Sequence, residues 1–239
     1  MQDTIGIILN NGEVWYLKYL LPYVLTLIFG IISFFLSQLY IRHLDRIRSR
    51  DKYLGYLRVI REEIKRNLDL MCQLHAYLYV RATPTFKLSF FVGDDMFSGI
   101  STICLNYELL NEIFYRYFDY RHIQDRLDKI IKITNDLKEI RAHSAVDHEQ
   151  EHLAERSLES ERGGTIMLIS GNTRVSFNTY NQITDELNSR NKRANLKKLP
   201  DNYLKELYDK FQVDEAVVNA VKFYGDRADL SKRPKFYES

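Results

Sequence analysis

Hydrophobic and polar positions are distributed unevenly along this chain, and the longest apolar stretch lies near its N-terminal end. No charged residue occurs between Lys18 and Arg42, a run of 23 residues. As a helix rising about 1.5 Å per residue, the run spans about 34 Å, more than a hydrocarbon core of about 30 Å. Acidic residues precede it and no small-residue cleavage site follows it. We therefore expect an uncleaved transmembrane helix over 19–41, after a short extracytoplasmic segment 1–18.

The less hydrophobic residues of this run share one helical face. They are spaced by four, three and four positions, as residues stacked on one side of a helix are. Small residues let helices pack closely, so this face predicts a dimer or small bundle. In a ring of several copies the hydroxyl groups would instead line a wet channel. Both interpretations predict self-association or a membrane partner, and the residues concerned are Thr26, Gly30, Ser33 and Ser37.

The charges that flank the run predict its orientation. Lys18 is the basic residue before it, whereas a basic cluster follows it directly. Basic flanks stay on the cytoplasmic side, so we expect a single-pass protein of the bacterial inner membrane with its N-terminus outside and its C-terminal domain in the cytoplasm. The cluster is also suited to anionic lipid headgroups. It consists of Arg42, Arg46, Arg48, Arg50 and Lys52.

Beyond the run, apolar residues recur at spacings of three and four, which indicates helices. We expect a helical cytoplasmic domain over 42–146. Its first helix continues from the membrane, with a candidate break at Gly55, and ends before Thr83 and Pro84. A second helix should begin near Asp94 or Ser98, and a third near Ile123.

The rest of the chain combines an acidic segment, a candidate hairpin and further helices. Residues 147–162 read as an acidic helix or linker, and 163–226 as a hairpin plus helices. The hairpin rests on TIMLIS and TRVSF, separated by the turn pair Gly171-Asn172. The tail 227–239 looks frayed. The predicted fold class is mainly α: one N-terminal transmembrane helix and a helical cytoplasmic domain with one candidate β-hairpin.

Two patterns raise the question of catalysis. The first is H-E-x-x-H at 148–152, in which His148 and His152 could share a zinc ion one helical turn apart. Its setting is highly charged and a third ligand is unassigned, so a solvated helix is the simpler interpretation. We expect no metal and no other cofactor.

The second pattern is an arginine followed by a histidine after five or six residues, and it resembles the active-site motif of HEPN ribonucleases. The pairs are Arg116 with His122 and Arg141 with His148. The histidine would transfer a proton and the arginine would stabilise phosphate charge. These residues could equally lie at the rim between two helices. Residue types without a known geometry do not establish an active site. Catalysis and a position at the rim therefore both remain open.

The overall layout is similar to the small membrane accessory proteins of type VI-B CRISPR systems. The matching features are the span at 19–41, its polar face and the two Arg/His pairs. The resemblance implies a divergent HEPN-like cytoplasmic domain and a ring that perforates the membrane when the RNA-guided nuclease is active. The acidic segment and the hairpin depart from that pattern.

Together these features predict a homo-oligomeric membrane-perturbing effector or channel in an antiviral or stress response, which needs no covalent chemistry. The alternatives are a membrane-tethered HEPN-like ribonuclease and an anchor that recruits a cytosolic partner. The expected partners are further copies of the chain, membrane lipid and either an RNA-guided nuclease or RNA. Because the net charge is only +2, we expect no binding to DNA.

Overall fold

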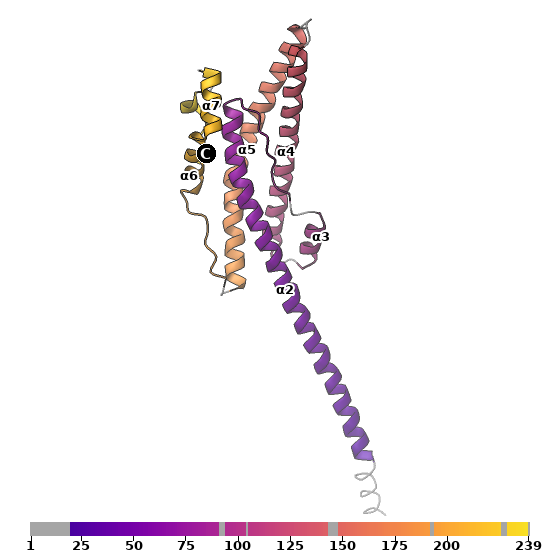
Figure 1. Cartoon of the computed structure of the whole chain (residues 1–239). Coiled ribbons are helices and arrows are strands. Elements are labelled where there is room, and N and C mark those ends of the chain that lie inside the picture. Colours follow the sequence, from indigo (N-terminus) through magenta and orange to yellow (C-terminus); the bar gives the residue numbers. More distant parts are fainter. Residues whose placement is uncertain are drawn as a thin grey trace, which may run out of the picture. The chain divides into compact units, whose positions relative to one another are not determined.

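A computed structural model describes residues 20–90, 94–103, 105–142, 148–191, 194–225 and 229–238. The predicted segment 1–18 lies outside these residues. The described chain is mainly helical, as predicted, and falls into two compact units, Met1–Lys52 and Tyr53–Ser239. Its elements are α2 (Leu21–Tyr79), α3 (Asp94–Ile103), α4 (Tyr107–Ala142), α5 (His148–Arg190), α6 (Tyr203–Gln212), α7 (Glu215–Tyr224) and the short 3-10 helix η3 (Leu230–Lys232) (Figure 1).

Helix α2 is continuous for 59 residues and passes Gly55 without the break considered above. Its first part is long and apolar enough to cross a membrane, and its most apolar window has no buried residue. Its last part belongs to the second unit, where Leu57, Ile60, Ile64 and Leu68 are almost fully buried. The spacing of three and four that predicted this helix therefore marks its core face.

Helix α2 ends in a Schellman motif. The N–H of Ala82 donates to the carbonyl of Tyr77 at 2.9 Å, and the N–H of Arg81 donates to the carbonyl of Leu78 at 3.2 Å. These are the two bonds that define the motif. Arg81 occupies the left-handed position, with φ of 63°, where glycine is the usual residue. The chain thus carries an arginine at a position that normally disfavours one.

The connector after α2 has no helix or strand over residues 82–90 and is held by side chains of α2 and α4. Asn67 of α2 donates to the carbonyl of Ser89 at 3.0 Å and accepts from its N–H at 2.7 Å. The N–H of Leu88 donates to Gln124 of α4 at 3.0 Å. Side-chain amides therefore satisfy the backbone groups that a neighbouring strand would otherwise satisfy.

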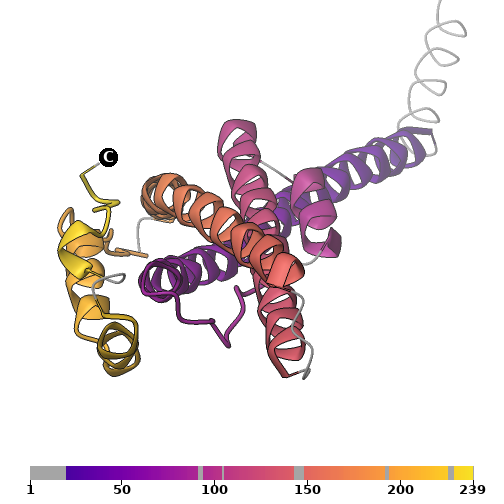
Figure 2. The same cartoon turned by 90° about the horizontal axis from the view of Figure 1, so that it is seen from above.

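Helices α4 and α5 form an antiparallel hairpin and pack against each other (Figure 1), and they cross at an angle when seen from above (Figure 2). Two separate helices meeting near Ile123 were expected here, and that expectation is wrong, because α4 is one helix through Ile123. Ile113, Ile123, Leu127 and Ile130 on its inner face are buried. A single apolar face therefore continues across the point where the sequence suggested a boundary.

The predicted β-hairpin around Gly171 is wrong, because α5 continues through it as helix. The acidic segment expected at 147–162 is likewise part of α5 from His148 onward. The β-branched and hydroxyl residues that indicated strands lie on the buried face of the helix at spacings of three and four. Thr173 donates to the carbonyl of Ile169 at 2.6 Å, and other hydroxyls of α5 bond in the same way. Bonds to the preceding turn let such residues remain in a helix.

The last part of the chain packs against the second half of α2 (Figure 1). Tyr203 at the start of α6 donates to Asp69 at 2.6 Å, and Tyr77 donates to Asp214 before α7 at 3.5 Å. Helices were expected at both places, and α6 and α7 confirm them. The tail was expected to be frayed, but Arg233 and Phe236 are buried, with exposed fractions of 2% and 1%.

Candidate functional site

The polar face of the first unit is open along its length. Thr26 donates its hydroxyl to the carbonyl of Pro22 at 2.8 Å, so its own helix satisfies it. A β-carbon added at Gly30 would meet no atom of the described chain within 4 Å. Thr26 and Gly30 also line a shallow groove of about 700 Å³ between the side chains of Tyr23 and Phe34. Ser33 and Ser37 are exposed and lie outside this groove.

The basic cluster after the apolar segment is exposed throughout. Arg42, Arg46 and Arg48 face solvent, as do Arg50 and Lys52. Arg50 forms an ion pair with the neighbouring Asp51 at 3.7 Å, and both side chains are more than half exposed. Such a pair contributes little free energy, so the cluster keeps its positive charge available for an external anionic surface.

Arg116 contacts the partner helix of the hairpin. Its Nη1 donates to Oδ1 of Asn172 in α5 at 2.7 Å and lies 2.8 Å from Oδ2 of Asp119. The side chain is only 11% exposed, and its buried Nε has no acceptor in the described chain. Burial raises the pKa of Asp119, while the nearby charges of Arg116 and His122 oppose that shift.

His122, the predicted partner of Arg116, is exposed on α4. The structure thus brings the two residues to the same part of the helix, with the Asp119 carboxylate influenced by both. To bind a phosphate, the Arg116 guanidinium would have to leave Asn172 and Asp119. This is the rim position between two helices that the sequence left open.

The second Arg/His pair is divided between the two helices at the connected end of the hairpin, with Arg141 near the end of α4 and His148 at the start of α5. Arg141 closes α4 onto α5 through Glu151 and Glu155, with nitrogen–oxygen distances of 2.6 and 2.5 Å. These contacts raise the pKa of Arg141 further above its usual value, the Glu151 hydrogen bond being the main cause. His148 and His152 are exposed on the first turns of α5. Within the described residues, no three His, Cys, Asp or Glu side chains gather into a metal site.

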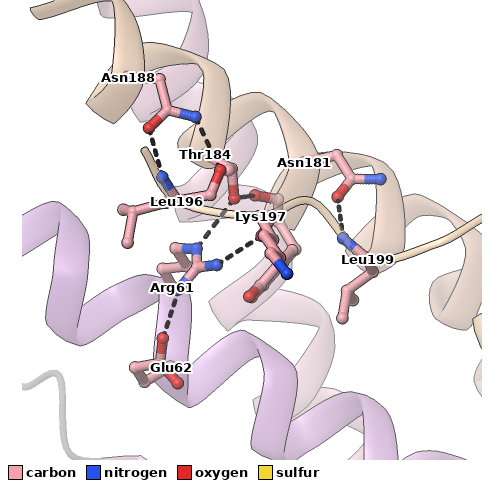
Figure 3. A network of polar contacts seen from close by, with 9 residues as sticks. Arg61, Glu62, Asn181, Thr184, Asn188, Leu196, Lys197 and Leu199 are labelled. Carbon is pink, nitrogen blue, oxygen red and sulfur yellow. Dashed lines mark hydrogen bonds and ion pairs between the residues drawn. The ribbon is translucent and has the colours of Figure 1, made fainter. Parts of the chain in front are cut away.

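A buried arginine that the sequence analysis did not identify joins three segments of the second unit (Figure 3). Arg61 of α2 donates to Thr184 of α5 at 2.9 Å and to the carbonyl of Lys197 at 2.8 Å, and its guanidinium lies over the ring of Tyr180. Its position on the buried face of α2 was the available signal. An arginine there needs partners, and the sequence does not identify them.

Two pockets also escaped the sequence analysis because helices distant in sequence form them. One, of about 690 Å³, lies between the start of α4 and the end of α5 and is acidic through Glu108, Glu112, Asp185 and Glu186. The other, of about 450 Å³, is lined by the turn after α2, by α4 and α5 and by the end of α7, and it is rich in arginine. It includes Arg141 but not His148.

No known protein family, curated protein or solved structure matches this chain. A functional assignment therefore rests on the residues and geometry described above.

Proposed function

We propose that this chain is a single-pass membrane protein that self-associates and perturbs the bilayer, as an effector or channel in antiviral or stress defence. The observation that carries the proposal is helix α2. It is one uninterrupted helix containing both the fully exposed apolar segment and the buried core face of the second unit. Such a helix can connect a change in a soluble domain to a membrane segment without a further element.

Self-association is supported by the open face of the apolar segment. Exposed Leu25, Ile28 and Phe29 suit acyl chains, whereas Gly30 offers no side chain to them. A glycine in a bilayer gains contacts when a neighbouring helix approaches closely. The groove between Tyr23 and Phe34, with Gly30 beside it, is shaped for a ridge of such a helix.

The orientation in this proposal follows from charge. The exposed basic cluster 42–52 directly follows the apolar segment, which favours a cytoplasmic position for the second unit. An accessible cysteine in place of Lys222, which is exposed on α7, should react with an impermeant maleimide only after the cells are permeabilised. Reaction in intact cells would reverse the proposed orientation.

The contacts of the arginines favour this role over catalysis. Arg116 is engaged by Asn172 and Asp119, and Arg141 by two glutamates of α5. In these positions both guanidiniums stabilise the helical hairpin. A membrane-tethered ribonuclease remains the alternative, because His122 is exposed beside Asp119.

Ion flux from liposomes containing the purified chain tests the proposal. We expect flux in the wild type, its loss in Ser33→Leu, and its retention in Ile32→Leu, a matched control on the neighbouring face, and in His122→Ala. Subunit counting in mild detergent should find three or more copies around an axis. A monomer without flux would refute the proposal. RNA cleavage that His122→Ala abolishes, without flux, would establish the ribonuclease instead.

A further inference from the structure

The arginine-rich pocket of the second unit has the size of a ligand site. Its volume is about 450 Å³, within the range of about 300–1,000 Å³ for small-molecule sites. Four separate segments contribute to its wall: the turn after α2, the C-terminal half of α4, the N-terminal half of α5 and the end of α7. A pocket lined by four segments is a more defined feature than a gap between two helices.

The wall of this pocket carries more positive than negative charge. Its cations are Arg81, Lys138, Arg141 and Arg162, and its carboxylates are Glu155 and Glu159. Two guanidiniums share one carboxylate, because Arg81 and Arg162 both contact Glu159 at 3.1 Å. Within the described chain, no carboxylate pairs with Lys138. Among the described residues of the wall, the excess is two positive charges. It falls to one when Glu151 is included, which pairs with Arg141 from outside the wall.

Arg162 places one of these positive charges inside the fold. The residue is 8% exposed, its Nη2 donates to the carbonyl of Arg81 at 3.0 Å, and its Nε has no acceptor in the described structure. Burial lowers the pKa of Arg162, against the opposing effect of Glu159. A buried and incompletely paired guanidinium is costly, and a nearby anion reduces that cost.

Arg81 provides a second, independent indication. It holds the left-handed position of the Schellman motif at the end of α2, where glycine would avoid the strain. Its side chain nevertheless lines the pocket and pairs with Glu159. Strained positions of this kind cluster at ligand-binding sites, where the side chain has a use that glycine cannot serve.

We propose that this pocket binds a small organic phosphate monoester. Lys138 would hold its phosphate, together with the guanidinium nitrogens of Arg81 and Arg141 that are not engaged by the glutamates. A phosphate monoester carries about −1.5 to −2 at pH 7, opposite in sign to the excess of one to two positive charges in the described wall. Guanidinium and ammonium groups donate charge-assisted hydrogen bonds to phosphate oxygens. Leu137 and Leu158 offer an apolar surface to the organic part, and Tyr224 offers an aromatic one. This proposal is independent of the membrane role.

Calorimetric titration of the detergent-solubilised full chain tests the proposal with three probes: AMP, ribose 5-phosphate and inorganic phosphate, with adenosine as the uncharged control. We expect at least one of the two organic phosphates to bind more tightly than inorganic phosphate, and adenosine to bind at least about tenfold more weakly than AMP, as loss of a charge-assisted contact predicts. If neither organic phosphate binds at millimolar concentration, or if inorganic phosphate binds as tightly as both, the proposal is overturned.

Variants locate the binding. Lys138→Gln should weaken it about tenfold, whereas Lys132→Gln, an exposed lysine on the same helix outside the pocket, should leave it unchanged. Arg81→Gly should also weaken binding while preserving the helix end, because glycine suits the left-handed position. A thermal midpoint of Arg81→Gly equal to that of the wild type, measured without ligand, would show that the fold of the variant is intact. Unchanged affinity in both Lys138→Gln and Arg81→Gly would place the ligand elsewhere and refute the assignment.

Discussion

Arg233 donates from Nε to Nδ1 of His75 at 3.0 Å, joining two residues 158 positions apart in the chain. The guanidinium also reaches the carbonyl of Cys72 at 3.4 Å and lies 4.2 Å from the ring centre of Tyr208. Since Nδ1 accepts, neutral His75 carries its proton on Nε2, which is buried without a partner in the described chain. The hydrogen bond from Arg233 thus fixes the tautomer of the neutral histidine.

This relationship predicts a pH-dependent stability. Burial, and secondarily the charge of Arg233, lower the pKa of His75 from 6.5 to about 3. Between these values the unfolded chain binds a proton that the folded chain does not. The free energy of unfolding should therefore fall as pH falls from 6.5 toward 3, with a contribution from His75 of up to about 1.4 kcal/mol per pH unit.

Urea unfolding at several pH values measures this contribution. His75→Gln should flatten the dependence below pH 6.5, whereas His152→Gln, a change at an exposed residue, should leave it as in the wild type. Parallel curves for the wild type and His75→Gln would contradict the prediction.

Because the tail is buried, shortening one of its side chains should have a large effect on the free energy of unfolding. Phe236 is 1% exposed and packs edge-on against the rings of His75 and Tyr208. Phe236→Ala should lower the free energy of unfolding by about 3–5 kcal/mol. Phe223→Ala is the matched control, because that ring is 83% exposed and its loss should cost little. Equal stability of the two variants in thermal unfolding would show that the tail does not belong to the core.

Replacing glycines of α5 by alanine tests whether this segment is a helix or the expected hairpin. A β-carbon at Gly163 or Gly171 would meet no atom of the described chain within 4 Å, so alanine at either position should stabilise the helix by about 1 kcal/mol. At Gly164 the β-carbon would displace the guanidinium of Arg126 from its pair with Glu161, and the gain should be smaller. Destabilisation by Gly171→Ala would instead indicate a tight turn.

Two asparagines of α5 hold the segment that follows it (Figure 3). Asn188 donates to the carbonyl of Leu196 at 2.9 Å and accepts from its N–H at 2.8 Å, whereas Asn181 accepts one bond from Leu199. Asn188→Ala should cost about 1–3 kcal/mol and Asn181→Ala less, because two backbone groups lose their partners in the first case and one in the second. Chemical denaturation gives both values, and a larger cost for Asn181→Ala would contradict this account.

The apolar pattern predicted most helices because their buried residues recur regularly. It failed at Gly171-Asn172, where a local turn signal outweighed a buried face that continues from Ile169 through Thr173 to Ser176. It also divided α4 at Ile123, although the apolar face does not change there. Local signals were misread in both places because the partner helix, which decides what is buried, is not visible in the sequence.

The site predictions were limited in a similar way. The sequence identified Arg116 and Arg141 as arginines of interest, but their partners Asn172 and Glu155 become neighbours only when α4 and α5 form the hairpin. The arginine-rich pocket depends on segments from Arg81 to Tyr224. Such contacts follow from tertiary structure and leave no pattern at short range.

The contact between His75 and the tail also determines when the second unit can be completed during synthesis. At about 5–20 residues per second, a ribosome takes roughly 8–32 s to make the chain between His75 and Arg233. During that interval His75 contacts neither the guanidinium of Arg233 nor the ring of Phe236. Nascent chains therefore pass through a stage in which the apolar residues around His75 are uncovered and open to chaperones.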